Sequence, residues 1–142
     1  MKATDIITRD HRAAEALFEE LKSTEDEESE AVVEKLLAAL DAHEKMEDEH
    51  FYPALESILD EDSAYAELKR EQALLEAEVA AVRALPVGRA AALKLAMPKV
   101  LEHATKEEEE ILPKAETLLG DGRLEELGAR MEPMSAVALQ EG

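Results

Sequence analysis

The sequence predicts an all-α fold, an antiparallel up-down-up-down four-helix bundle followed by a short fifth helix. The chain has 142 residues with 5 Gly and only 3% aromatic residues, and it is rich in Ala, Leu, Glu and Lys, a composition that favours helix over strand. Apolar residues also recur at spacings of three, four and seven along four long segments. Because short connections join these segments, we expect neighbouring helices to run antiparallel around one core.

The first two helices are predicted over about residues 4–22 and 30–60. The apolar stripe of the first consists of Ile7, Ala14, Phe18 and Leu21. The stripe of the second consists of Val33, Leu36, Leu40, Phe51, Leu55 and Ile58. Between the two helices, residues 23–29 are polar and acidic, which predicts a solvated loop in which Ser29 caps the second helix.

The third and fourth helices are predicted over about residues 63–85 and 89–119. Asp62 or Ser63 is placed to cap the third helix, and Pro86 with Gly88 interrupts the chain before the fourth. The stripe of the third helix consists of Leu68, Leu75, Val79 and Val82. The stripe of the fourth consists of Leu93, Ala96, Val100 and Ile111.

Two glycines at positions 120 and 122 end the fourth helix. The apolar spacing of the following segment, residues 124–131, predicts a fifth helix that lies across the bundle. Residues after Pro133 are expected to fray. The expected division is therefore a four-helix bundle over residues 1–119 and a short helix with a tail over residues 120–142.

An internal repeat surrounds two prolines that stand where a helix should continue. Residues 43–53 and 103–113 both read H-x-x-x-E-[DE]-E-x-apolar-apolar-P, at an offset of 60 positions. Each proline removes one backbone hydrogen bond and is expected to kink its helix. The chain is therefore predicted to consist of two related helix pairs, in which Asp10-His11 of the first pair aligns with Glu71-Gln72 of the second.

The repeat places a His and a Glu on one helical face, close enough to bind one metal ion. Extending the apolar stripes puts His43 with Glu47, and His103 with Glu107, inside the bundle. His11 lies four residues after Ile7 and falls on the inward face of the first helix. A buried carboxylate is costly unless it is paired or bound to metal, so the pattern predicts a metal site in the core.

Some of these residues have a plainer interpretation. A single inward histidine such as His11 is more often a hydrogen-bonded core residue than a ligand. His50 lies three residues after Glu47, but the second repeat has Glu110 at the equivalent position, so His50 is assigned to the boundary of the site. Imidazole and carboxylate ligands suit iron, manganese or zinc, and carboxylates from two helices can bridge two ions.

Charge and composition limit the partners. The chain has 35 Asp and Glu against 16 Lys and Arg, a formal charge of −19, so nucleic acid and anionic membranes are excluded as expected partners and metal cations are favoured. It has no Cys, which excludes thiolate sites, and no segment typical of a signal peptide or a membrane span. A cytoplasmic location is the resulting expectation.

The motifs resemble those of the hemerythrin-like family, also called the HHE cation-binding domain. The resemblance covers about residues 4–119: Asp10-His11 in the first helix, then the two H-x-x-x-E motifs that end in proline. It implies a hemerythrin-like four-helix bundle with a non-heme di-iron centre. By the same resemblance His11, His43 and His103 would be terminal ligands, and Glu47 and Glu107 would bridge the ions.

The third helix departs from the family pattern. Family members usually offer a histidine there, whereas this chain has Glu71-Gln72 and no histidine between His50 and His103. Gln72 takes the inward position and is a candidate weak ligand. Glu71 or Glu76 could supply a carboxylate instead, and otherwise the second metal ion would be loosely held or absent.

Three functions are compatible with this pattern. The first is a protein that binds or senses oxygen, nitric oxide or iron through a His/Glu site. The second is a di-iron oxidoreductase acting on peroxide or another small oxidant. The third is a bundle with a depleted metal site. The sequence favours the first two, because five of the ligand positions implied by the family are present and are costly to bury without metal. It does not decide whether the protein is an enzyme, and it leaves the oligomeric state open.

Overall fold

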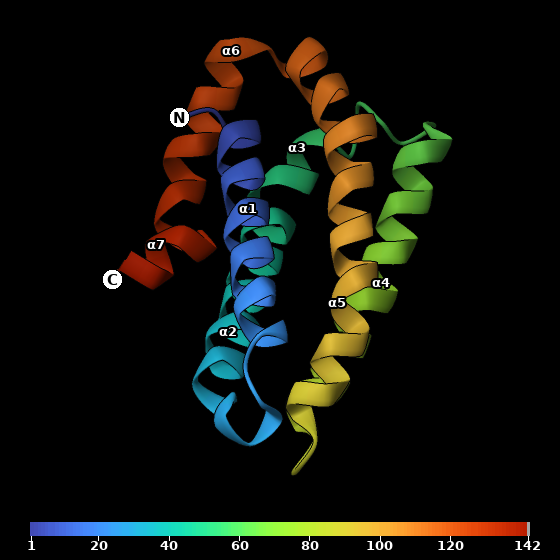
Figure 1. Cartoon of the computed structure of the whole chain (residues 1–142). Coiled ribbons are helices and arrows are strands. Elements are labelled where there is room, and N and C mark those ends of the chain that lie inside the picture. Colours follow the sequence, from blue (N-terminus) through green and yellow to red (C-terminus); the bar gives the residue numbers. More distant parts are fainter. Residues whose placement is uncertain (142) are drawn as a thin grey trace.

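The computed structural model describes residues 1–141, and every regular element in that range is helical. Four helices form an antiparallel up-down-up-down bundle (Figure 1). Their bounds are α1 (Ala3–Lys22), α2 (Glu30–Met46), α4 (Ser63–Ala84) and α5 (Arg89–Lys106). The other helices are α3 (Tyr52–Leu55), α6 (Leu112–Met131) and α7 (Ala136–Glu141), with single 3₁₀ turns at Asp26–Glu28 and Glu132–Met134. The predicted all-α bundle is confirmed.

The helix ends follow local sequence signals. Asp62 caps α4 as predicted, because its carboxylate accepts a hydrogen bond of 2.9 Å from the backbone N–H of Tyr65. Ser29 occupies the position before α2, but its hydroxyl donates to the carbonyl of Asp26 and does not cap the helix. Gly88 precedes α5 with φ of 79°, a left-handed conformation that favours glycine.

The two repeated segments contain π turns where kinks at the prolines were predicted. These turns are η2 (Glu47–Phe51) and η3 (Glu107–Ile111). In η2 the N–H of Tyr52 bonds to the carbonyl of Glu47, and in η3 the N–H of Leu112 bonds to the carbonyl of Glu107. Each proline then falls in the first turn of the next α-helix, where its missing N–H costs nothing. The π turn therefore accommodates the proline, and the chain remains helical on both sides of it.

The fifth helix lies beside the bundle. The path of α6 bends sharply at Gly120, which has φ of 77° and ψ of 164°, and the residues that follow run back along α1 (Figure 1). Close approach is possible because Gly128 has no side chain: a Cβ built there would lie 1.9 Å from the carbonyl oxygen of Met1. The chain after Pro133, which was expected to fray, instead forms α7, and both Ser135 and Ala136 are buried.

The core consists of two apolar clusters separated by a polar layer. One cluster lies around Phe51, Tyr65 and Ile111, and the other around Phe18, Leu36 and Leu93. Along α1, α2 and α4, and along α5 with the π turn that follows it, the polar layer falls between residues of the first cluster and residues of the second. The candidate site is in this layer.

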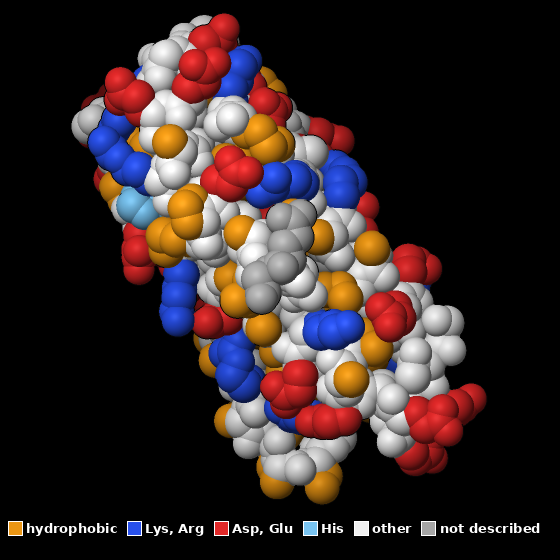
Figure 2. Space-filling model, turned by 90° about the vertical axis from the view of Figure 1, so that its left-hand side faces the viewer, with side chains coloured by type: hydrophobic (Ala, Val, Ile, Leu, Met, Phe, Trp, Pro, Cys, Tyr) orange, Lys and Arg blue, Asp and Glu red, His pale blue; other side chains and the backbone are white. Residues whose placement is uncertain are grey.

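The surface carries most of the acidic charge. Of the Asp and Glu side chains in the described part of the chain, only Asp10, Glu47 and Glu107 are buried. On the face formed by α7 and the second half of α6, acidic side chains alternate with basic and hydrophobic ones (Figure 2). Within residues 1–141, none of the helices has the length and apolar character that crossing a membrane would require.

Candidate metal centre

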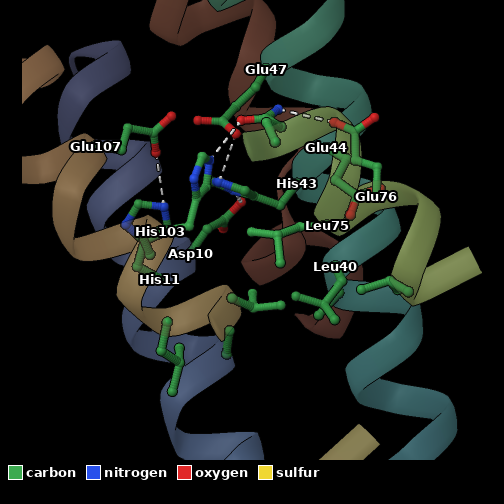
Figure 3. Close-up of a pocket in the computed structure, with 17 residues that line it drawn as sticks. Asp10, His11, Leu40, His43, Glu44, Glu47, Leu75, Glu76, His103 and Glu107 are labelled. Carbon is green, nitrogen blue, oxygen red and sulfur yellow. Dashed lines mark hydrogen bonds and ion pairs between the residues drawn. The ribbon is translucent and has the colours of Figure 1, made fainter. Parts of the chain in front are cut away.

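Four side chains converge in the polar layer: His11 from α1, His43 from the last turn of α2, and the first residues of the two π turns, Glu47 and Glu107 (Figure 3). One potential ligand atom of each lies within 4.8 Å of those of the others. We call these four residues the His/Glu cluster. The two π turns matter here because each begins at a cluster carboxylate, and a widened turn at a site is a common functional feature.

His11 is held between two glutamates of η3. Its Nε2 lies 3.1 Å from Oε1 of Glu107, and its Nδ1 lies 2.6 Å from Oε2 of Glu108. Arg12 pairs with the other oxygen of Glu108 and holds this carboxylate beside the ring. Nδ1 of His11 therefore faces Glu108, while Nε2 faces the cluster.

His43 is held in the same way by Asp10. Its Nδ1 lies 3.0 Å from Oδ2 of Asp10 and its Nε2 lies 3.2 Å from Oε1 of Glu47. Burial lowers the pKa of His43, but the adjacent Glu47 and Asp10 carboxylates outweigh it and raise the pKa well above its ordinary value. For Asp10, burial opposes ionisation, but hydrogen bonds from His43, Ala136 and Val137 lower the pKa overall.

The two cluster glutamates form a coupled acidic pair. Burial raises the pKa of Glu47 well above its ordinary range, and the neighbouring Glu107 charge raises it further. Burial acts on Glu107 as well, but hydrogen bonds from Glu47 and His11 lower its pKa overall. A proton held by Glu47 therefore limits the repulsion between the two carboxylates, which are buried with exposures of 3% for Glu47 and 1% for Glu107.

The orphaned atoms of the cluster indicate what it can hold. Nε2 of His43 and Oε2 of Glu47 are buried and make no hydrogen bond. Unsatisfied buried polar atoms are costly, and these two are a nitrogen and an oxygen of the kinds that bind iron, manganese or zinc. The donor set and the burial of the cluster therefore fit a metal ion.

A second group of side chains lies against Glu107. The hydroxyl of Tyr52 donates to Oε2 of Glu107 and lies 2.9 Å from Oε1 of Gln72. Gln72 is 6% exposed, so it faces inward as predicted, and its Oε1 is 3.3 Å from Nε2 of His103. His103 is thus next to the His/Glu cluster but is not one of its four members. Burial lowers the pKa of His103, which favours the neutral ring.

The other predicted carboxylates lie outside the cluster. Glu71 pairs with Lys106 and approaches the outer nitrogen, Nδ1, of His103 at 3.5 Å. Glu76 accepts a hydrogen bond of 3.1 Å from Nε2 of Gln72. His50 is half-buried in η2 and is not part of the cluster.

An apolar cavity of about 60 Å³ adjoins the cluster. The cluster residues line it together with apolar side chains that include Leu40 and Leu75 (Figure 3). Glu44 also lines the cavity, and burial raises its pKa to about 7. The volume exceeds what one water requires, so a small molecule could enter.

Three residues of the site were not predicted as its members. Asp10 and Glu108 hold the outer nitrogens of the two cluster histidines, and Tyr52 holds Glu107. The signals were weak, because Asp10 and Glu108 look like ordinary acidic neighbours of predicted ligands. Tyr52 is one position before a repeated proline, where the second repeat has Leu112.

The fold has a counterpart among solved structures. The chain aligns with the crystal structure of a hemerythrin HHE cation binding domain-containing protein from Mycobacterium kansasii, at a TM-score of 0.76 and 23% identity. The alignment covers 99% of this chain and 91% of that one. At this identity, the likeness shows the fold alone. Comparison with curated protein sequences gave no match.

The family is shown by the sequence model described as the Hemerythrin HHE cation binding domain, which matches residues 2–115. The match includes both repeated motifs, all four residues of the His/Glu cluster, and His103. The site is therefore of the metal-binding type, and the chain belongs to the hemerythrin HHE cation-binding family.

Proposed function

We propose that this protein holds a non-heme iron pair in the polar layer and binds oxygen or nitric oxide there. The observation that carries the proposal is the His/Glu cluster, in which four potential ligand atoms lie within 4.8 Å of one another and two buried atoms make no hydrogen bond. His11, His43 and His103 would be terminal ligands. Glu47 and Glu107 would be shared between the ions.

A bound iron pair would supply an exchangeable coordination position and electrons for a small ligand. The chain supplies the surroundings. Asp10 and Glu108 orient the two cluster imidazoles, so that each presents Nε2 toward the centre. The apolar wall that includes Leu40 and Val79 limits water beside the site, which suits a neutral diatomic ligand.

A second candidate function is the turnover of peroxide. It is favoured by the pair formed by Tyr52 and Gln72, whose polar groups lie beside Glu107 and next to His103. A phenol and an amide at this position could exchange their present hydrogen bonds for bonds to a small polar oxidant, which an apolar wall could not. If the protein turns over peroxide, the oxidant would bind on the side of the metal centre where Gln72 takes the position of a histidine.

Metal analysis tests both functions. We expect the purified protein to carry iron, and the matched variant Glu47→Ala to lose most of it. Reduced wild-type protein would then be mixed with oxygen, nitric oxide and hydrogen peroxide while the visible spectrum is recorded. A reversible absorption band with oxygen or nitric oxide supports binding, and repeated consumption of peroxide supports the enzyme. Wild-type protein that takes up neither iron, manganese nor zinc would contradict both.

A further inference from the structure

Asp10 connects the candidate metal centre to the C-terminal helix. Its side chain has no exposed surface and makes three hydrogen bonds. Oδ2 accepts from the backbone N–H of Ala136 at 3.0 Å and lies 3.0 Å from Nδ1 of His43, while Oδ1 accepts from the N–H of Val137 at 3.1 Å. The two backbone donors are the first residues of α7, 126 and 127 positions away in the chain.

These contacts fix the orientation of the His43 ring. An ionised carboxylate can only accept hydrogen bonds, so Nδ1 of His43 must carry a hydrogen toward Asp10. Nε2 is then the atom that faces Glu47, and it is the nitrogen available to a metal ion. Because both Asp10 oxygens also accept from α7, the carboxylate cannot turn without breaking a bond to the helix.

The helix also packs against α1 and α2, but among the described residues few other hydrogen bonds join α7 and Ser135 to the bundle. Arg9 donates to the hydroxyl of Ser135 at 3.3 Å, and the Gln140 amide lies 3.5 Å from the carbonyl of Lys35. Ala136 is buried, but Leu139 is 51% exposed. Undocking α7 would remove two of the three hydrogen bonds that fix the Asp10 carboxylate and would free it to turn away from His43.

We propose that Asp10 is a positioning residue that couples the docking of α7 to metal binding by His43. The inference rests on the proposed metal centre. Coupling of this kind is reciprocal: a docked α7 favours metal binding, and a bound metal favours the docked helix. His103 has no such connection, since its partner Glu71 is 30% exposed and pairs with Lys106.

The first test uses the unmodified full-length protein. Hydrogen exchange of the Ala136 and Val137 amides would be measured by NMR with no metal and with saturating Fe²⁺ under anaerobic conditions, and again with Zn²⁺. We expect metal to slow exchange at these two amides more than at Leu139 on the same helix. Equal exchange rates with and without bound metal would overturn the coupling. Failure of either metal to bind would overturn the proposed function as well, so the two outcomes are distinguishable.

The second test is a double-mutant cycle in the full chain. Asp10→Asn preserves the shape but not the charge, and Ala136→Pro removes one backbone donor at a position whose preceding residue is already extended, with ψ of 158°. We expect Asp10→Asn to weaken Fe²⁺ and Zn²⁺ binding about 10- to 100-fold. Ala136→Pro should weaken it about threefold, the loss of one modest hydrogen bond.

The double variant and a control variant distinguish coupling from two independent effects on metal affinity. In the Asp10→Asn background, Ala136→Pro should have no further effect on metal affinity, because its route to His43 is already broken. Gln140→Ala, which removes only the contact of α7 with the Lys35 carbonyl, should leave the affinity unchanged. If the fold-losses of metal affinity in Asp10→Asn and Ala136→Pro multiply in the double variant, the coupling is overturned. Unchanged metal affinity in Ala136→Pro protein that has retained its helical circular dichroism would overturn it as well.

Discussion

The two copies of the repeated motif have the same backbone but different surroundings. Both run from an α-helix through a π turn to a proline, and both place a glutamate at the start of the π turn. The first copy packs its histidine, His43, against the fully buried Asp10, which is anchored by α7. The second packs His103 against Gln72 and the partly exposed pair of Glu71 and Lys106.

This difference teaches that a repeated sequence can produce an asymmetric centre. The shared elements set where the glutamates lie, whereas the companion helices α1 and α4 decide how firmly each histidine is held. The additional C-terminal layer formed by α6 and α7 packs mainly against α1 and α2, so only the first copy is braced. We therefore expect one firm and one open side of the metal centre.

The largest expected effect is the loss of metal on removal of the firmly held histidine. His43→Ala removes a cluster ligand and leaves Asp10 and Glu47 buried without their shared partner, so we expect metal affinity to fall by more than about 100-fold, which is over ~2.7 kcal/mol. His103→Ala should retain more metal, because His103 is not in the cluster. Metal content per chain, measured by mass spectrometry of the purified variants, checks this. Greater loss in His103→Ala than in His43→Ala would reverse the assignment of firm and open sides.

The packing of α6 against α1, which supports the first copy of the motif, can be weakened by a substitution outside the site. A Cβ at Gly128 would meet the backbone oxygen of Met1 at 1.9 Å, so Gly128→Ala should lower the free energy of unfolding by about 1–3 kcal/mol through overpacking. Gly122→Ala is the matched control in the same helix, since nothing lies within 4 Å of its Cβ position. Denaturant unfolding measures both variants. An unchanged midpoint in Gly128→Ala would mean that the contact between α6 and the start of α1 is not tight.

The open side can be made more like the firm one. Gln72→His would place an imidazole on the inward face of α4, beside His103 and Tyr52, and we expect it to tighten metal binding about tenfold, or ~1.4 kcal/mol. A metal titration followed by the visible spectrum of the iron-loaded protein measures the change. Gln72→Ala is the control, and it should not gain affinity. Identical metal content and spectra for Gln72→His and wild type would count against Gln72 facing the metal.

The smallest effect is expected at the exposed support of His103. Lys106→Ala removes the ion pair with Glu71, and both side chains are substantially exposed, so the free energy of unfolding should change very little. Metal affinity should change little. Thermal unfolding and a metal titration, run beside Asp10→Asn, check this. A loss of affinity as large as that of Asp10→Asn would remove the contrast between the two copies.

Sequence periodicity predicted the bundle well, because each helix has a continuous apolar stripe. The same stripes, extended by one turn, placed His11, His43, Glu47 and Glu107 on inward faces, and the structure brings these four together. Gln72 also faces inward as the alignment of α1 with α4 predicted. These successes share one cause, since each depends only on the period of a single helix.

The features that sequence reasoning missed depend on contacts between distant segments. The tail after Pro133 has no strong helical signal, and it is ordered by bonds to Asp10 that span more than a hundred residues. The prolines predicted a disturbance of the helix at residues 53 and 113. A kinked helix and a π turn can both accommodate a residue that has no backbone N–H, so the sequence alone did not distinguish the two conformations. The hydrogen bond from Tyr52 to Glu107 likewise joins two elements whose rotation is set by packing.

The π turns have a consequence for how this chain tolerates length changes. A π turn is equivalent to one residue inserted into an α-helix, so each repeat is one residue longer than an uninterrupted helix would need. Deleting one exposed residue, such as Asp48 in the first repeat or Glu109 in the second, would therefore restore regular α-helical winding and leave the downstream residues in about their present orientation, because the π turn accommodates its extra residue locally. Leu55 and Ala115, both fully buried, would stay in the core. A residue deleted elsewhere in these helices, where the winding is already regular, would instead rotate everything downstream by about 100°. The π turn is therefore the place in each repeat where the fold can lose one residue and keep its core-facing side chains.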